Sequence, residues 1–132
     1  MPEGDNKVLA GGPMMGKAVN SLDVPVCKGT NAVTVLSGSD AVRKPAVPCV
    51  RCGKCVSVCP MGLEPYLLAT KSALHLYDGL EEHGITSCIS CGSCQFTCPA
   101  HRPILDNILL GKGVVMAQIK ARAAKAKAAQ QK

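Results

Sequence analysis

The sequence has few aromatic side chains. Aromatic residues make up 2% of its 132 residues, tryptophan is absent, and the complete set is Tyr66, Tyr77 and Phe96. Aromatic rings usually supply much of the area that a folded core buries. A chain with so few of them needs another source of cohesion, and its nine cysteines are the obvious candidates.

Two further absences bear on the compartment in which the chain works. The first seven residues are mostly polar and contain no apolar stretch, so we expect no secretory signal. No run approaches the ~18 apolar residues of a membrane-spanning helix. We therefore expect a cytosolic chain, in which disulfides are rare and cysteine thiolates bind metals.

The C-terminal segment lacks acidic residues, although the chain as a whole does not. Its net charge is +6, and residues 1–110 carry nine basic and nine acidic residues. The whole excess therefore lies in residues 111–132, as Lys112, Lys120, Arg122, Lys125, Lys127 and Lys132. Such a segment can contact anionic lipid, but we favour a solvated tail. Nucleic acid is not expected as a partner, because there are few rings for bases to stack on.

An internal repeat dominates the sequence. Residues 49–60 read Cys-Val-Arg-Cys-Gly-Lys-Cys-Val-Ser-Val-Cys-Pro, and residues 88–99 read Cys-Ile-Ser-Cys-Gly-Ser-Cys-Gln-Phe-Thr-Cys-Pro. The four cysteines, the glycine and the proline coincide without a gap. Three cysteines at two-residue spacing can wrap one loop around three corners of a cubane iron–sulfur cluster, so the fourth thiolate must come from elsewhere.

The spacing predicts two [4Fe–4S] clusters and crossed ligation. In two-cluster ferredoxins the fourth cysteine of each run ligates the other cluster. We therefore assign one cluster to Cys49, Cys52, Cys55 and Cys98, and the other to Cys88, Cys91, Cys94 and Cys59. Gly53 and Gly92 are expected to let the backbone approach the clusters. Pro60 and Pro99 are expected to turn the chain away after the fourth ligand.

The main alternative to clusters is a pair of structural zinc sites. Zinc usually takes two C-x2-C knuckles, whereas each run here supplies four cysteines and a proline. Cys27 stands alone, either as a redox-active thiol or, as we favour, as a small semi-buried residue. His75, expected inside a helix, His83 and His101 have no ligand pattern and are interpreted as packing or surface residues. We find no catalytic residues.

The remaining segments predict a mainly α fold, in which a helical dicluster ferredoxin-like domain follows a short β-containing, Gly/Pro-rich segment. Short strands are expected at residues 8–10 and 32–36. A helix beginning at Pro65 is expected between the two cysteine runs, with Gly79 and Gly84 as natural terminators. A second helix follows Pro103, weakened by two glycines and fraying beyond Lys120. The expected domains are 1–48, the end of a β-grasp-like segment; 49–103, the dicluster domain; and 104–132, a helix with a basic tail.

Three motifs together resemble the RnfC family of Rnf electron transport complexes. The first is Gly11-Gly12-Pro13-Met14-Met15-Gly16, and the second is Pro25-Val26-Cys27-Lys28-Gly29-Thr30-Asn31. The third is the double cysteine run with its helical spacer and the exit Cys98-Pro99-Ala100-His101-Arg102-Pro103. The glycine–methionine motif is the most specific, and the resemblance spans residues 8–120.

The resemblance implies electron transfer in a membrane-associated, ion-translocating ferredoxin:NAD oxidoreductase. Its partners would be the other redox subunits, and it would bind peripherally on the cytoplasmic side of the cell membrane. The family also has a long N-terminal domain for flavin and NADH, which has no counterpart here, so those groups are expected only in a missing domain or a partner. A soluble electron-transfer or cobalamin-reductase-type subunit shares these modules and is the alternative.

Overall fold

The computed structural model describes residues 6–130. The chain divides into two compact units, Met1–Ala46 and Val47–Lys132. Within the described residues there are three β-strands and four α-helices. The mainly α description is therefore not confirmed, because the first unit is built on a sheet.

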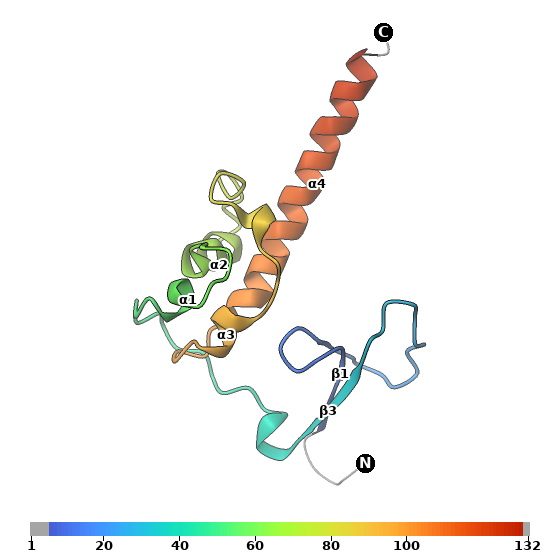
Figure 1. Ribbon diagram of the computed structural model, residues 1–132, viewed down its shortest axis with the longest axis vertical. Coiled ribbons are helices and arrows are strands. Elements are labelled where there is room, and N and C mark those ends of the chain that lie inside the picture. Colours follow the sequence, from blue (N-terminus) through green and yellow to red (C-terminus); the bar gives the residue numbers. More distant parts are fainter. Residues whose placement is uncertain (1–5, 131–132) are drawn as a thin grey trace. The chain divides into compact units, whose positions relative to one another are not determined.

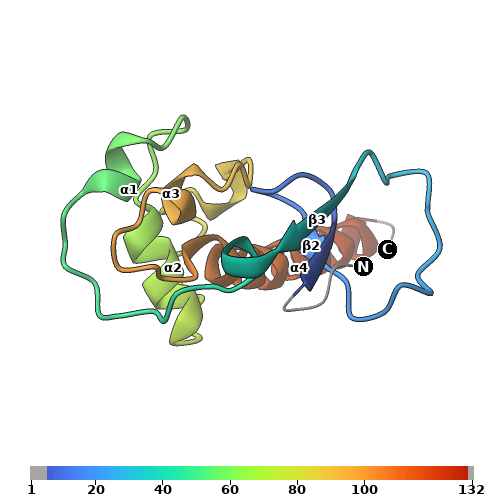
Figure 2. The ribbon, with the colours of Figure 1, turned by 90° about the horizontal axis from the view of Figure 1, so that it is seen from below.

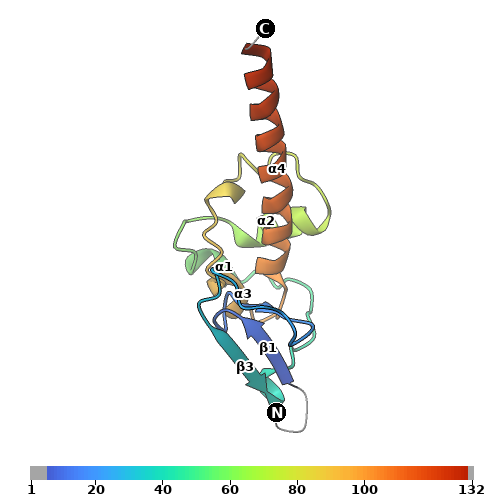
Figure 3. The same ribbon diagram turned by 90° about the vertical axis from the view of Figure 1, so that its right-hand side faces the viewer.

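The first unit is a small antiparallel sheet (Figure 3). Its strands are β1 (Asn6–Ala10), β2 (Lys17–Ala18) and β3 (Val33–Ser37), in the order β2-β1-β3. A 3-10 helix, η1 (Gly38–Asp40), follows β3. The expected strands correspond to β1 and β3, whereas the two-residue β2 was not expected because its sequence carries no strand pattern.

The glycine–methionine motif is the turn between β1 and β2. Gly11 has a φ of 117°, which L side chains rarely adopt, and the Gly16 N–H donates to the Gly12 carbonyl at 2.7 Å. A Cβ at Gly16 would lie 2.5 Å from the Gly12 carbonyl oxygen. The loop therefore requires glycine at both positions.

The second unit contains all four helices. They are α1 (Lys54–Ser57), α2 (Pro65–Ala73), α3 (Ser93–Phe96) and α4 (Ile104–Gln130), and η2 (Ile85–Ser87) is a 3-10 helix before the second cysteine run. The segment between the cysteine runs is helical as predicted, and α2 begins at Pro65. The helix expected to fray beyond Lys120 continues to Gln130.

The helix α2 ends earlier than predicted, and His75 lies outside it. The Leu76 N–H donates to the Lys71 carbonyl, and the His75 N–H to the Ser72 carbonyl. His75 has a φ of 57°. This is the Schellman pattern, which normally uses glycine at the left-handed position. The prediction that His75 lies inside the helix was wrong, because a histidine gives no sequence signal for this ending.

The core of the second unit lies between α2 and the first half of α4 (Figure 1). Figure 2 shows α1 and α3, the helices of the two cysteine runs, next to each other. The buried cluster is aliphatic apart from one cysteine, and consists of Leu68, Ala69, Leu80, Ile85, Cys94, Ile104, Ile108 and Val115. Cys55, Cys88 and Cys98 pack against it partly buried, so the cysteine runs and the core are one structure.

Candidate metal centre

The two cysteine runs adopt the same backbone conformation. Gly53 and Gly92 precede α1 and α3 with φ angles of 75° and 84°. A Cβ at Gly53 would meet no protein atom within 4 Å, so among protein atoms the left-handed backbone is what requires glycine. The expected close approach of these glycines to a cluster stays a prediction.

The prolines after the fourth cysteine of each run occupy matching tight turns. The Gly62 N–H donates to the Cys59 carbonyl at 3.1 Å, and the His101 N–H donates to the Cys98 carbonyl at 3.1 Å. Pro60 and Pro99 therefore hold the second position of a four-residue turn, which suits their fixed φ. The chain therefore turns directly after each run, and the expected role of these prolines beside a cluster ligand stays a prediction.

The conformational repeat contains non-glycine residues that the sequence analysis missed. Arg51 and Ser90 occupy equivalent places in the runs, and their φ angles are 52° and 60°. His101 has a φ of 49° where the first run has Gly62 at 62°. Left-handed backbone is uncommon outside glycine and is found at binding loops. Only the alignment of the two runs could have suggested these positions.

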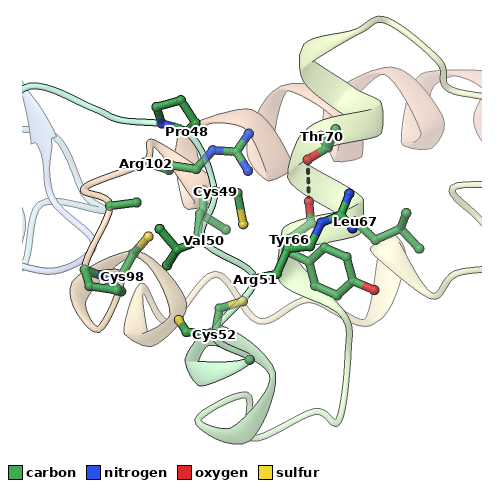
Figure 4. Close-up of a pocket in the computed structure, with 15 residues that line it drawn as sticks. Pro48, Cys49, Val50, Arg51, Cys52, Tyr66, Leu67, Thr70, Cys98 and Arg102 are labelled. Atoms are coloured by element: carbon green, nitrogen blue, oxygen red, sulfur yellow. Dashed lines mark hydrogen bonds between the residues drawn. The ribbon is translucent and has the colours of Figure 1, made fainter.

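The first run and the end of the second run surround an open cavity of ≈ 790 Å³. Its cysteines are Cys49, Cys52, Cys55 and Cys98. Figure 4 shows Cys49, Cys52 and Cys98 around the same space, with Arg102 beside Cys49. Arg51, Arg102, Tyr66 and Thr70 supply the polar part of the lining. The structure thus brings together three cysteines of one run and the fourth of the other.

The second run and the end of the first run line a second cavity. Its cysteines are Cys59, Cys88, Cys91 and Cys94. Its volume of ≈ 20 Å³ is far smaller than that of the first cavity. The other lining residues are glycine or apolar, namely Pro60, Met61, Leu63, Pro65, Leu68, Ile89, Gly92, Leu105 and Ile108. The two cavities divide the eight cysteines in the crossed pattern, but differ in size and polarity.

Hydrogen bonds favour the thiolate form of one cysteine in each run. The Arg51 backbone N–H lowers the pKa of Cys49, against a smaller opposing effect of burial, and the Arg102 guanidinium adds a hydrogen bond and its charge. The pKa of Cys91 is lowered by hydrogen bonds with the Ser93 hydroxyl and the Ser93 backbone N–H. The Cys91 Sγ and the Ser93 Oγ are 3.5 Å apart. Thiolates are the ligand form of cysteine, so these contacts favour metal binding.

Burial acts in the opposite sense on the third cysteine of each run. Desolvation raises the pKa of Cys55, and it raises the pKa of Cys94 to about 11.

The Leu63 N–H donates to the Cys59 sulfur at 3.4 Å. Backbone N–H groups directed at sulfur are among the features that set the reduction potential of iron–sulfur centres.

The donor set fits a cluster better than a single ion. Within residues 6–130, no three His, Cys, Asp or Glu side chains gather closely enough to hold one metal ion. The eight cysteines instead surround two cavities in sets of four, and the first cavity has room for a group of several atoms. Four thiolates per site is the donor set of a [4Fe–4S] cluster.

The remaining candidate residues lie outside both cavities. Cys27 is exposed, so the expected semi-buried position was wrong, and it belongs to the first unit. The His75 Nδ1 is 2.7 Å from the Tyr77 hydroxyl, and the His83 Nε2 is 2.9 Å from the Lys71 Nζ. Both histidines thus make exposed side-chain contacts at the surface of the helical unit.

Comparison with known families identifies the cysteine-rich region. Residues 41–99 match the family model described as a 4Fe-4S dicluster domain. This match covers both cysteine runs and the helix between them. It supports two [4Fe–4S] clusters as the cofactors of the chain and assigns residues 41–99 to the ferredoxin-like dicluster domains.

Curated relatives match most of the chain. The C subunit of the ion-translocating oxidoreductase complex of Rhodobacter capsulatus is 37% identical over 84% of this chain and 21% of its own length. The C subunit of the Na+-translocating ferredoxin:NAD+ oxidoreductase complex of Acetobacterium woodii is 40% identical over 85% of this chain and 25% of its own length. The C subunit of the ion-translocating oxidoreductase complex of Yersinia pestis is 36% identical over 96% of this chain and 21% of its own length.

The match is extensive for the chain but partial for its relatives. The chain spans 21% to 25% of the length of the first two proteins, and the region it shares with them contains the cysteine runs. Within residues 6–130 we find no helix of the length and apolar character needed to cross a membrane. The chain thus contains a 4Fe-4S dicluster domain, and its relatives, which are 36% to 40% identical over most of its length, are C subunits (RnfC) of ion-translocating oxidoreductase complexes.

Proposed function

We propose that the chain transfers single electrons between two [4Fe–4S] clusters as part of the RnfC component of an ion-translocating ferredoxin:NAD+ oxidoreductase complex. The observation that carries the proposal is the crossed arrangement of the cysteines. Each cavity is lined by three cysteines of one run and the fourth cysteine of the other. Crossed ligation would tie the runs together and keep the two centres close, which electron transfer requires.

The residues that would hold the clusters follow from the two cavities. Cys49, Cys52, Cys55 and Cys98 would hold one cluster, and Cys88, Cys91, Cys94 and Cys59 the other. A bound [4Fe–4S] cluster supplies a one-electron couple with a potential set by its surroundings. The protein would contribute the thiolates, the N–H group directed at Cys59, and two glycine-dependent loops.

Metal analysis on anaerobically prepared protein is the first test. We expect about eight irons and eight acid-labile sulfides per chain, and a low-temperature EPR signal from reduced clusters after dithionite treatment. The Cys27→Ser variant is the matched control, because Cys27 lines neither cavity, and it should keep the full iron content. About two zinc ions per chain without sulfide would instead indicate a structural metal module and would overturn the proposal.

Paired substitutions test the crossed assignment. The C52A/C98A variant removes two ligands of one proposed cluster, so it should keep about four irons in the other. The C52A/C59A variant removes one ligand from each proposed cluster, so it should lose both. Uncrossed ligation predicts the reverse pattern. The pair separates the two assignments because both variants remove the same number of thiols.

The neighbours of the chain are proposed from its relatives. The matched proteins are subunits of ion-translocating oxidoreductase complexes, so we infer other redox subunits as partners and peripheral attachment on the cytoplasmic side of the membrane. Flavin and NADH would bind in other parts of such a complex. Affinity purification from cells that contain the complex should recover membrane-embedded subunits with the chain. Recovery of the chain alone, with full iron content, would contradict this assignment.

The segment before the cysteine runs and the tail complete the proposed organisation. The antiparallel sheet supports residues 1–48 as the end of a β-grasp-like segment, ahead of a dicluster domain at 49–103.

Lys120, Lys125 and Lys127 are exposed on α4. If they contact anionic lipid, changing all three to glutamine should weaken flotation with phosphatidylserine vesicles. Unchanged flotation would leave the 104–132 segment as a solvated helix end.

A further inference from the structure

A cationic side chain lies beside each set of cysteines. Neither of the two side chains is a candidate cluster ligand. At the first cavity this is Arg102, which follows the second cysteine run. Arg102 is half-buried, and its guanidinium is close to Cys49 (Figure 4). Its position is set by the tight turn at Cys98 and by the start of α4 immediately after it. A positive charge is thus held against the site that the first run surrounds.

At the second set of cysteines the cation is Lys112 on α4. The Lys112 Nζ donates a hydrogen bond of 2.6 Å to the Cys88 carbonyl, and the contact is partly buried. The residue before it, Gly111, is buried against α2, which fixes the rotation of α4 at this turn. A lysine in a half-buried position adjacent to the second run is therefore held in place by the packing of two helices.

We propose that Arg102 and Lys112 are tuning residues that each raise the reduction potential of one cluster, Arg102 of the first and Lys112 of the second. The inference rests on the proposed function. A four-thiolate cluster carries about −2 when oxidised and about −3 when reduced. A nearby cation stabilises the more negative state more strongly, and the effect is screened less where the charges are partly buried.

The two sites differ in nearby charge and in polarity, and this difference predicts which cluster has the higher reduction potential. The first cavity is open, and two arginines, Arg51 and Arg102, are among the residues that line it. Among the described residues no charged side chain lines the second cavity, whose walls are apolar apart from the cysteines. Lys112 does not line this cavity, and its contact with the second run is the hydrogen bond to the Cys88 carbonyl. Desolvation opposes the added negative charge. The first cluster should therefore have the higher potential and should hold the electron in the singly reduced protein.

Redox titration of the reconstituted full chain, followed by EPR, tests the assignment. Wild type should show two reduction steps. R102M should move only the step at higher potential, to a more negative value, and K112M should move only the other step in the same direction. The K125M variant has the same change of net charge on an exposed part of α4 and should move neither. R102K and K112R keep the positive charge, so their reduction potentials should stay close to the wild-type values.

The ordering of the sites is tested separately. The C52A/C98A variant leaves only the second set of cysteines intact, so it should retain the lower step and lose the higher one. Loss of the lower step would overturn the ordering. Steps that stay at wild-type potentials in R102M and K112M, or that move equally in K125M, would overturn the tuning roles. A wild-type chain without iron, sulfide and reduction steps would instead refute the proposed function itself, which keeps the two failures distinct.

Discussion

Replacing Gly111 with alanine should destabilise the helical unit, although alanine is the better helix former. A Cβ at Gly111 would overlap the Ser72 Oγ, and it would lie 2.9 Å from the Ser72 Cβ and 3.2 Å from the Ile85 Cδ1. Ser72 belongs to α2 and is fully buried. Rotation of the Ser72 side chain cannot move its Cβ away from the new methyl group, so the two helices must move apart.

The size of the effect follows from two opposing contributions. Replacing glycine with alanine inside a helix is favourable by roughly 0.8–1 kcal/mol when nothing obstructs the methyl group. Forcing an extra methyl group into a packed core is unfavourable by about 1–3 kcal/mol. The overlap lies with buried atoms of the neighbouring helix, so we expect the second contribution to dominate, for a net loss of up to about 2 kcal/mol in unfolding free energy.

Gly113→Ala is the matched control on the same helix. A Cβ at Gly113 would meet nothing within 4 Å, and Gly113 is exposed. The alanine should therefore stabilise α4 by a few tenths to about 1 kcal/mol. Two nearby positions of one helix should thus respond in opposite directions to the same substitution.

The assay is thermal unfolding followed by far-UV circular dichroism, at equal iron content in all variants. Metal-binding proteins often unfold irreversibly, so apparent Tm values are compared at one scan rate. For a unit of this size each kcal/mol corresponds to roughly 4–8 °C in Tm. Gly111→Ala should lower Tm and Gly113→Ala should leave it equal or higher. A Gly111→Ala protein as stable as wild type would refute the close contact between α2 and α4.

Three further predictions concern single side chains of the helical unit. Ser72→Ala should raise the unfolding free energy by about 1 kcal/mol, measured by chemical denaturation, because the Ser72 Oγ is buried without a hydrogen-bond partner among the described residues; a large loss of stability would show that the hydroxyl is satisfied. Gln95→Ala should lower the apparent Tm, since the Gln95 Oε1 accepts the Leu105 N–H at 2.9 Å at the start of α4, a contact of about 1 kcal/mol; Gln95→Glu, which keeps the acceptor, should retain most of the stability. In cluster-free protein at pH 8, iodoacetamide should alkylate Cys91 before Cys94, because Ser93 lowers the pKa of the first thiol and burial raises that of the second to about 11; the neutral Cys94 thiol also stabilises the folded form, so that contribution should be lost as pH rises from 9.0 to about 11. Equal alkylation rates measured by peptide mass spectrometry would contradict this difference.

The cysteine pattern by itself identified the cofactor. Ligand spacing within a run is local, because three thiolates two residues apart belong to one loop whatever surrounds it. The family model and the relatives agree with that interpretation. The start of α2 at Pro65 was equally local, since proline suits the first helical turn.

The backbone of the binding loops was not readable from residue type. Arg51, Ser90 and His75 have left-handed φ angles, although none of them is glycine. The first two lie in the cysteine runs, and the third ends α2. Residue type favours this backbone region mainly for glycine, so propensity could not identify these positions.

The sequence alone thus predicted two clusters, cysteine ligands for both and the start of α2, because these depend on short-range spacing. The tertiary structure decided which cation lies beside each set of cysteines and how polar each cavity is. Gly111 illustrates the difference. In the sequence it only weakens a helix, whereas in the fold it allows α4 to lie against Ser72 of α2. Such roles depend on residues distant in the chain, and only the packed structure brings them into contact.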